Sequence, residues 1–113
     1  RNTEALKEVL EAAWDKLTSL DESDIFAKPV SDDMAPDYSK FVSKPMDLSR
    51  MHAKISSKRR VGQHTASSDY ASLNDLAADV ELMLANCIRY NGLKSFFGTY
   101  ATKFRGKWRK SLN

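Results

Sequence analysis

The segment NCIRYNG, residues 86–92, places an asparagine where it could bind a ligand. Asn91 lies 18 positions after Leu73, which is five turns of a helix with about 3.6 residues per turn. It therefore lies on the same helix face as Leu73, Val80 and Cys87, an apolar stripe. An asparagine amide stays neutral at physiological pH and presents both N–H donors and a carbonyl acceptor. Asn91 is therefore a candidate for binding a neutral, polar group at the end of an apolar face.

Helix geometry alone leaves two interpretations of Asn91 equally open. A buried amide without partners costs about 1 to 3 kcal/mol, so Asn91 needs hydrogen bonds. In the first interpretation it bonds to nearby backbone carbonyl groups, and Asn-Gly closes the helix because both residues tolerate a left-handed conformation. In the second, the amide faces a ligand at the mouth of an apolar cavity. Asn86 lies off the Leu73 line, and we expect it to have a structural role.

Four amphipathic segments are expected to position these residues. Apolar residues recur along each segment at spacings of three and four, the period of a helix with one buried face. In a single domain of 113 residues, this pattern predicts an all-α four-helix bundle with a long loop between helices one and two. The predicted helices span residues 4–19, 47–56, 72–90 and 95–112.

The loop at residues 20–44 is unusual because it combines prolines with large apolar residues. Long loops are uncommon in compact domains and usually carry function. We therefore expect this loop to form one wall of a binding site. The connection at residues 56–71 is polar, basic and aperiodic, so we expect it to be a surface loop.

Several classes of protein are excluded by composition. No apolar run approaches the roughly 18 residues of a membrane-spanning helix, and the one cysteine, Cys87, cannot form an intrachain disulfide. His52 and His64 have no Cys, Asp or Glu at a zinc-like spacing, so we expect no metal site. No nucleophile, base and orienting acid stand in a catalytic pattern, so we expect neither an enzyme nor a cofactor.

Charge is divided unevenly along the chain. Residues 1–50 carry 7 Lys or Arg against 11 Asp or Glu, whereas residues 51–113 carry 11 against 4. Basic surfaces favour phosphate backbones or acidic partners, although a solvated basic face is the simpler explanation. The basic residues cluster in two places: Lys58, Arg59 and Arg60, and Lys103, Arg105, Lys107, Arg109 and Lys110.

Three longer motifs resemble a bromodomain, the module that binds acetylated lysine. They are FAKPV at residues 26–30, APDYSKFVSKPMDL at residues 35–48 and DVELMLANCIRYN at residues 79–91, followed by an aromatic final helix. The resemblance covers nearly the whole chain. It implies a left-handed four-helix bundle whose long first loop and short third loop together form the acetyl-lysine pocket.

The resemblance also implies roles for individual residues. Asn91 matches the asparagine that donates to the acetyl carbonyl, and Tyr38 matches the tyrosine that reaches it through an ordered water. Two departures from the family pattern stand at the rim, where the aromatic shelf is reduced and the loop is short. The other matched positions are Val30 and Phe26 against the acetyl methyl and floor, Cys87 in the lining, Tyr90 beside Asn91, Phe97 or its neighbour Phe96 as gatekeeper, Ile25 at the shelf, and Met34 and Ala35 at the rim.

These matches predict an acetyl-lysine reader in the nucleus, binding acetylated histone tails or other acetylated nuclear proteins and recruiting its parent protein to chromatin. Small-molecule mimics of acetyl-lysine are expected to bind as well. Two competing hypotheses stay open: a helical nucleic-acid-binding module that uses Lys58, Arg59 and Arg60, and a protein-interaction module whose altered shelf and loop have closed the pocket.

Overall fold

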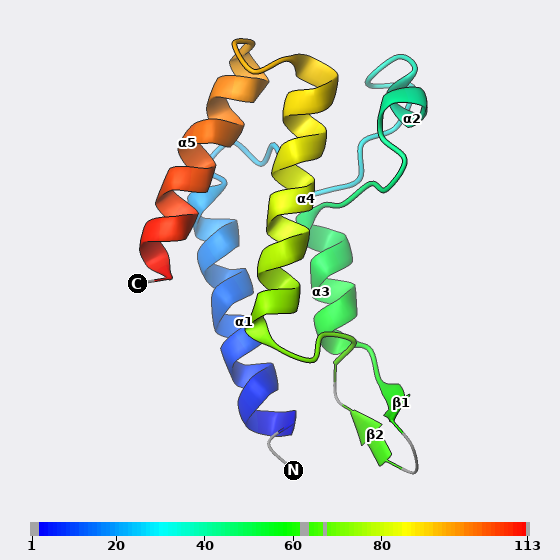
Figure 1. Cartoon of the computed structure of the whole chain (residues 1–113), viewed down its shortest axis with the longest axis vertical. Coiled ribbons are helices and arrows are strands. Elements are labelled where there is room, and N and C mark those ends of the chain that lie inside the picture. The colour runs from blue at the N-terminus through cyan, green and yellow to red at the C-terminus, as the bar shows by residue number, and fades with distance from the viewer. Residues whose placement is uncertain (1–2, 62–63, 67, 113) are drawn as a thin grey trace.

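The computed structural model describes residues 3–61, 64–66 and 68–112 and confirms the all-α four-helix bundle (Figure 1). Helix α4 packs beside α5, and α1 packs beside α3. One more helix, α2, is a single turn within the long loop, which the sequence did not predict. The helices are α1 Thr3–Leu20, α2 Tyr38–Phe41, α3 Leu48–Ser56, α4 Leu73–Asn91 and α5 Phe96–Ser111.

Capping side chains fix where three of the helices begin. Asp47 accepts hydrogen bonds from the backbone N–H groups of Ser49 and Arg50, and Ser72 accepts one from that of Asp75. Ser95 caps α5 in the same way. These cap residues have extended backbones and stand just outside their helices. For that reason α3, α4 and α5 each start one residue later than the sequence predicted.

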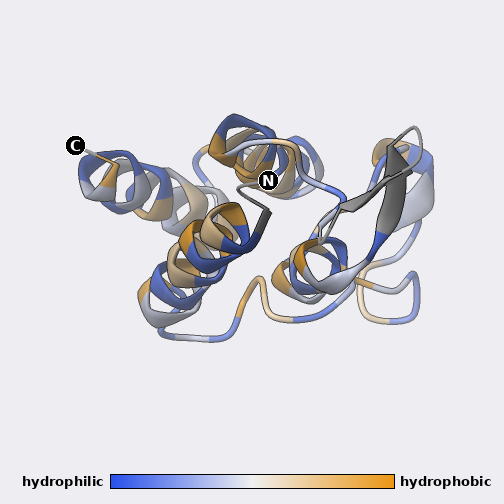
Figure 2. Ribbon diagram, turned by 90° about the horizontal axis from the view of Figure 1, so that it is seen from below, coloured by the Kyte–Doolittle hydropathy of each residue, from blue (hydrophilic) through white to orange (hydrophobic). Residues whose placement is uncertain are grey.

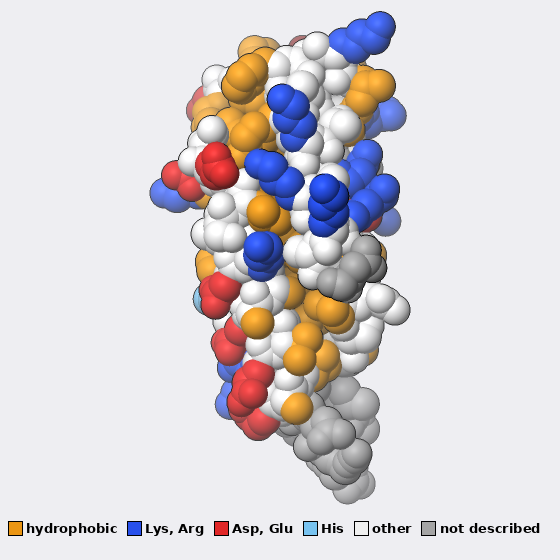
Figure 3. All heavy atoms as spheres, turned by 90° about the vertical axis from the view of Figure 1, so that its left-hand side faces the viewer, with side chains coloured by type: hydrophobic (Ala, Val, Ile, Leu, Met, Phe, Trp, Pro, Cys, Tyr) orange, Lys and Arg blue, Asp and Glu red, His pale blue; other side chains and the backbone are white. Residues whose placement is uncertain are grey.

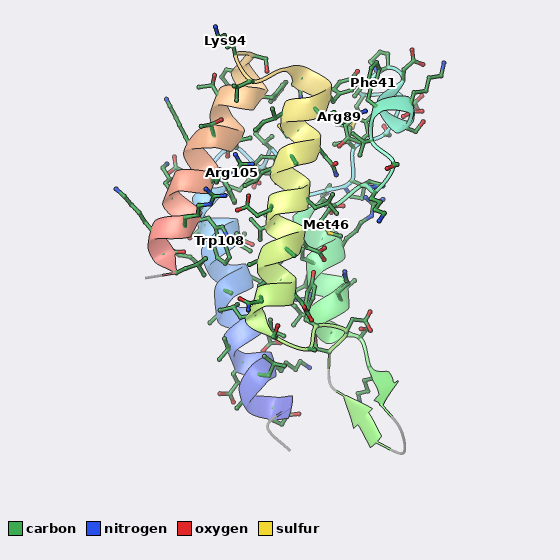
Figure 4. The ribbon with its side chains drawn as sticks, in the orientation of Figure 1. Phe41, Met46, Arg89, Lys94, Arg105 and Trp108 are labelled. Carbon is green, nitrogen blue, oxygen red and sulfur yellow. The ribbon has the colours of Figure 1, made fainter. Side chains whose placement is uncertain are left out.

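The core lies between the four long helices, and Figure 2 shows apolar and polar residues on different sides of them. Each helix contributes large side chains that are almost fully buried, as the spacing of apolar residues indicates. Trp108 of α5 is among the most deeply buried, and Figure 4 shows it between α5 and its neighbours. The deeply buried members include Leu10, Leu17, Met51, Ile55, Leu76, Val80, Leu84, Ala101, Phe104 and Trp108.

The connection predicted as an irregular surface loop contains a short antiparallel hairpin instead. Strand β1, Arg59–Val61, pairs with β2, His64–Ala66. Strands of three residues are too short to show the alternating pattern by which a strand is predicted. Residues 62–63 and 67 and the side chains of Arg59, Arg60 and His64 lie outside the described part of the structure.

The segment after the hairpin is attached to α3. The carbonyl oxygen of Lys54 accepts from the Ser68 hydroxyl at 3.1 Å and from the Asp69 N–H at 2.8 Å. Tyr70 is buried, and its hydroxyl donates to Asp79 of α4 at 2.7 Å. These bonds hold the chain in place at the end of the bundle opposite the long loop.

None of the described helices is long and apolar enough to cross a membrane.

Candidate functional site

The first part of the long loop is held by Asp21, the residue that follows α1. Its buried carboxylate accepts from the backbone N–H groups of Ile25 at 3.0 Å and Phe26 at 2.8 Å. Phe26 in turn packs its ring edge-on against Phe104 of α5, with ring centroids 5.1 Å apart. The loop therefore leaves α1 in a fixed turn that directs Ile25 and Phe26 toward α4 and α5.

The second part of the loop is held by side chains near the end of α4. Three of them donate to backbone carbonyl groups of the loop. Figure 4 shows Arg89 and Phe41 on the facing sides of α4 and the loop. Asn86 thus has the structural role that the sequence indicated. The three bonds are Asn86 Nδ2 to Lys44 O at 2.8 Å, Arg89 Nε to Phe41 O at 2.6 Å and Tyr90 Oη to Pro36 O at 2.7 Å.

Between the loop, α4 and the start of α5 lies a cavity of about 280 Å³. All ten site residues predicted from the sequence line this one cavity. The ten are Ile25, Phe26, Val30, Met34, Ala35, Tyr38, Cys87, Tyr90, Asn91 and Phe97.

Five further residues line the cavity and were not predicted: Asp24, Lys28, Met46, Asp47 and Met83. Met83 lies one turn before Cys87 on the same apolar face, so helix periodicity could have identified it. Met46 and Asp47 belong to the Pro-Met-Asp-Leu motif. No comparable signal marks Asp24 or Lys28, because their position depends on how the loop turns.

Asn91 is half-buried and has one firm hydrogen bond within the protein. Its Nδ2 donates to the carbonyl oxygen of Cys87, one turn earlier, at 3.0 Å. The same nitrogen lies 3.7 Å from the Cys87 Sγ, a weak acceptor. The amide oxygen has no partner within the described residues. The bond expected from the first interpretation is therefore present, and it fixes the amide without using all of its capacity.

Tyr38 stands across the cavity on α2. Its ring packs edge-on against Tyr90, with centroids 5.1 Å apart, and its hydroxyl bonds to none of the described residues. Burial raises the pKa of Tyr38 above its ordinary value. The phenol therefore stays neutral at physiological pH and can both donate and accept.

The Cys87 thiol is a lining group rather than a nucleophile. Burial raises the pKa of Cys87, and the hydrogen bond from Asn91 opposes this only in part. The thiol donates to the Phe97 carbonyl oxygen at 3.5 Å. A protonated thiol is a poor nucleophile, so the structure gives Cys87 a packing role.

Two of the three charged residues that line the cavity are exposed, whereas the third, Asp47, is buried. Asp24 and Lys28 are exposed, and Asp47 is committed to its helix cap and to an ion pair with Arg50 at 3.3 Å. The remaining lining residues are neutral. A neutral ligand with one polar group fits such a site, whereas an ammonium group would lose its hydration without gaining a free carboxylate deep in the cavity.

The mouth of the cavity is apolar and open to solvent. Met34 is 77% exposed and Phe97 is 40% exposed, although both line the cavity. Phe96 is 73% exposed, does not line it and packs edge-on against Phe97 with centroids 5.3 Å apart. Of the two candidates for the gatekeeper position, Phe97 is therefore the one beside the cavity.

Comparison with known proteins decides the family. The family model for bromodomains matches residues 10–103. This chain belongs to the bromodomain family. Bromodomains generally bind acetylated lysine and are reader modules rather than enzymes.

Curated relatives are bromodomain proteins that are much longer than this chain. The bromodomain and PHD finger-containing protein 3 of Mus musculus is 35% identical over 97 residues, 86% of this chain but 7% of the relative. Bromodomain-containing protein 7 of Homo sapiens is 32% identical over 96% of this chain and 15% of its own length. The likeness is therefore to one domain of each relative.

Solved bromodomains share the fold, including the left-handed four-helix bundle. A Leishmania donovani bromodomain complexed with bromosporine superimposes with a TM-score of 0.77 at 27% identity, covering 92% of this chain and 80% of that one. A Cryptosporidium bromodomain gives a TM-score of 0.78 over 95% and 91% of the two chains; at 22% identity, this match concerns the fold alone.

Proposed function

We propose that this bromodomain reads acetyl-lysine in histone tails or other acetylated nuclear proteins, and so recruits its parent protein to chromatin in the nucleus. One observation carries the proposal: Asn91 and Tyr38 line the same apolar cavity, and each has unused hydrogen-bonding capacity there. The domain itself performs no chemical step in this proposal.

Recognition follows from what acetylation does to lysine. It turns an ammonium ion into a neutral amide, whose carbonyl oxygen accepts from Asn91 Nδ2 and, through a water molecule, from the Tyr38 hydroxyl. The acetyl methyl group packs against Phe26 and Val30. An unmodified lysine would bring a charge into an apolar cavity, at a cost of at least several kcal/mol.

The other lining residues shape the pocket around these contacts. Cys87 and Ile25 form an apolar part of the cavity wall, and Tyr90 holds the loop through its bond to Pro36. At the mouth, where the lysine stem enters, the exposed Met34 and Phe97 and the half-buried Ala35 contact the peptide.

The same chemistry predicts that small acetyl-lysine mimics bind the cavity. The Leishmania donovani relative was solved with bromosporine, and we propose that bromosporine occupies the same place here and competes with acetylated peptides. The chain spans only 7% of a curated relative, so the likeness does not extend to that relative's partners and complexes.

Isothermal titration calorimetry tests the proposal with one histone-tail peptide in acetylated and unmodified forms. We expect the acetylated form to bind and Asn91→Ala to weaken this binding at least about fivefold, since an unpaired carbonyl costs about 1 to 3 kcal/mol. Asn74→Ala is a matched control, because Asn74 is an exposed asparagine on the same helix. Equal binding of both peptides, or no effect of Asn91→Ala, would contradict the proposal.

A second candidate function, contact with nucleic acid, is favoured by the charges of α5. No acidic residue follows Glu81, and Glu81 is paired with Arg105 at 3.1 Å and Arg109 at 3.2 Å. Lys103, Lys107 and Lys110 are exposed at spacings of four and three, so they share one face of α5. Figure 3 shows Lys and Arg side chains gathered on this side of the molecule.

We propose that any nucleic-acid contact is weak and made through phosphates, by this lysine face and by Lys58, Arg59 and Arg60 of the hairpin segment. Replacing Lys103, Lys107 and Lys110 by Gln should lower the affinity for a labelled DNA duplex at low salt. Replacing Lys16, Lys40 and Lys44 removes the same charge elsewhere and is the control. Equal losses of DNA affinity in the two triple variants would show an effect of net charge alone.

A further inference from the structure

Asp21 joins three parts of the fold at one buried carboxylate. It is the first residue after α1 and is 2% exposed. Its Oδ1 accepts from the Ile25 N–H at 3.0 Å and from the Tyr100 hydroxyl of α5 at 2.5 Å, while its Oδ2 accepts from the Phe26 N–H at 2.8 Å. One side chain therefore links the end of α1, the start of the loop and α5.

Tyr100 contributes more than one bond to this junction. Its hydroxyl donates to Asp21 and also accepts from the backbone N–H of Ser23 at 3.3 Å. Burial, and then the hydrogen bond to Asp21, raises the pKa of Tyr100 to about 12. The phenol is therefore protonated throughout the physiological range and remains a donor to the carboxylate.

The turn that these residues hold has no regular structure of its own. Asp24 adopts a left-handed conformation with φ 54°, and the N–H groups of Ile25 and Phe26 bond to the Asp21 side chain, not to a helix or strand. Without the carboxylate, the buried Phe26 N–H would lose its partner. The position of this turn therefore depends on Asp21.

The turn carries part of the cavity wall, but the residues that hold it lie behind that wall. Ile25 and Phe26 line the cavity, whereas Asp21 and Tyr100 do not. The Phe26 ring packs against the Tyr100 ring with centroids 5.7 Å apart, and the Phe26 carbonyl oxygen accepts from the Leu48 N–H at 2.8 Å. A shift of Tyr100 or Asp21 would therefore move the wall directly.

We infer that Asp21 and Tyr100 are positioning residues that hold the Ile25–Phe26 wall in the geometry that accepts acetyl-lysine. This inference rests on the proposed function, because the wall matters for binding only if the cavity is the acetyl-lysine pocket. Affinity then depends on two side chains that never touch the ligand.

The chain contains a matched control for this pair. Tyr70 also donates its hydroxyl to a carboxylate, that of Asp79 at 2.7 Å; Tyr70 is buried and Tyr100 is half-buried. Neither of these residues lines the cavity. Tyr100→Phe and Tyr70→Phe therefore remove the same kind of bond, one behind the cavity wall and one away from it.

Two measurements on both variants test the inference. Calorimetry gives the affinity for an acetylated histone-tail peptide, and hydrogen exchange followed by NMR gives the protection of the Ile25 and Phe26 amides. Tyr100→Phe removes the bond to Asp21 and the bond from Ser23. We expect it to weaken binding by about three- to tenfold and to speed exchange at both amides. Tyr70→Phe should change neither, whatever it does to the melting temperature.

Asp21→Asn provides an independent variant. The Asn amide keeps one acceptor but points an NH₂ group at one of the donors, so it should weaken binding and speed exchange more than Tyr100→Phe does. Unchanged affinity in both Tyr100→Phe and Asp21→Asn, or equal losses in Tyr100→Phe and Tyr70→Phe, would overturn the inference. If the wild type fails to prefer the acetylated peptide, the proposed function fails and this inference falls with it. In that case the exchange rates of the Ile25 and Phe26 amides still show whether Asp21 and Tyr100 hold the turn.

Discussion

At the scale of single residues, Asn91 has one feature expected from each of the two interpretations that the sequence left open. Its bond to the Cys87 carbonyl oxygen belongs to the structural interpretation, and its position in the lining of the cavity belongs to the functional one. Helix periodicity could predict that Asn91 faces inward, because that depends only on spacing. It could not predict how many N–H groups the protein itself uses, because that depends on the rotamer of the side chain.

Tyr38 provides a prediction at the same scale. Its hydroxyl bonds to none of the described residues, so Tyr38→Phe should leave the melting temperature nearly unchanged. Acetylated peptide should bind about fivefold more weakly, since one hydrogen bond through water is lost. Calorimetry and a thermal melt of the same sample check both parts. A large fall in stability without a change in affinity would show that the hydroxyl serves the fold instead.

At the scale of elements, the helices and the loop differ in how far they can be predicted. The four long helices follow from local signals, the apolar period and the caps Asp47, Ser72 and Ser95. The path of the loop follows from bonds between residues far apart in sequence, such as Asn86 to Lys44. The resemblance to a family could therefore identify which loop residues reach the cavity. The sequence could not predict the turns of the loop, the helix α2 or the hairpin.

Asn86→Ala tests how strongly α4 holds the loop. Asn86 is 7% exposed, and its loss leaves the Lys44 carbonyl group without this donor. We expect the free energy of unfolding to fall by about 1 to 3 kcal/mol, as measured by urea denaturation. The exposed Asn74→Ala should change it by less than about 0.5 kcal/mol. Comparable effects of the two substitutions would argue against a structural role for Asn86.

At the scale of the whole molecule, the uneven charge of the sequence becomes a surface pattern. In Figure 3 the Lys and Arg side chains gather in the upper and central part of one face, with acidic side chains along its left edge. Three of the residues that line the cavity are charged, and of these Asp24 and Lys28 are exposed and Asp47 is buried. The two ion pairs of Glu81 neutralise part of the basic surface and leave the lysine face of α5 exposed.

Alkaline pH should destabilise the whole domain. Burial is the main cause that raises the pKa values of Tyr38, Tyr70, Cys87 and Tyr100. In the unfolded chain these groups lose their protons near their ordinary pKa values, about 8.5 for Cys and 10 for Tyr. Above about pH 8.5 the folded protein therefore holds more protons than the unfolded chain, and the free energy of unfolding falls as pH rises.

Urea denaturation at pH 7, 9 and 10.5 measures this effect. The midpoint should stay level up to about pH 8 and then fall steadily. Tyr70→Phe, which removes one of the four groups, should make the fall shallower. An increase in the urea midpoint between pH 9 and pH 10.5 would contradict the predicted loss of stability.

The central claim is that Asn91 donates to the carbonyl oxygen of acetyl-lysine, and NMR of its side-chain amide tests this most directly. Nitrogen-15-labelled protein is titrated with one histone-tail peptide in acetylated and unmodified forms, with Asn91→Ala assigning the resonance. We predict that one Nδ2 proton of Asn91 moves downfield with the acetylated peptide and stays in place with the unmodified one. A bound acetylated peptide that leaves both Nδ2 protons unmoved, or an equal shift with either peptide, would contradict the account.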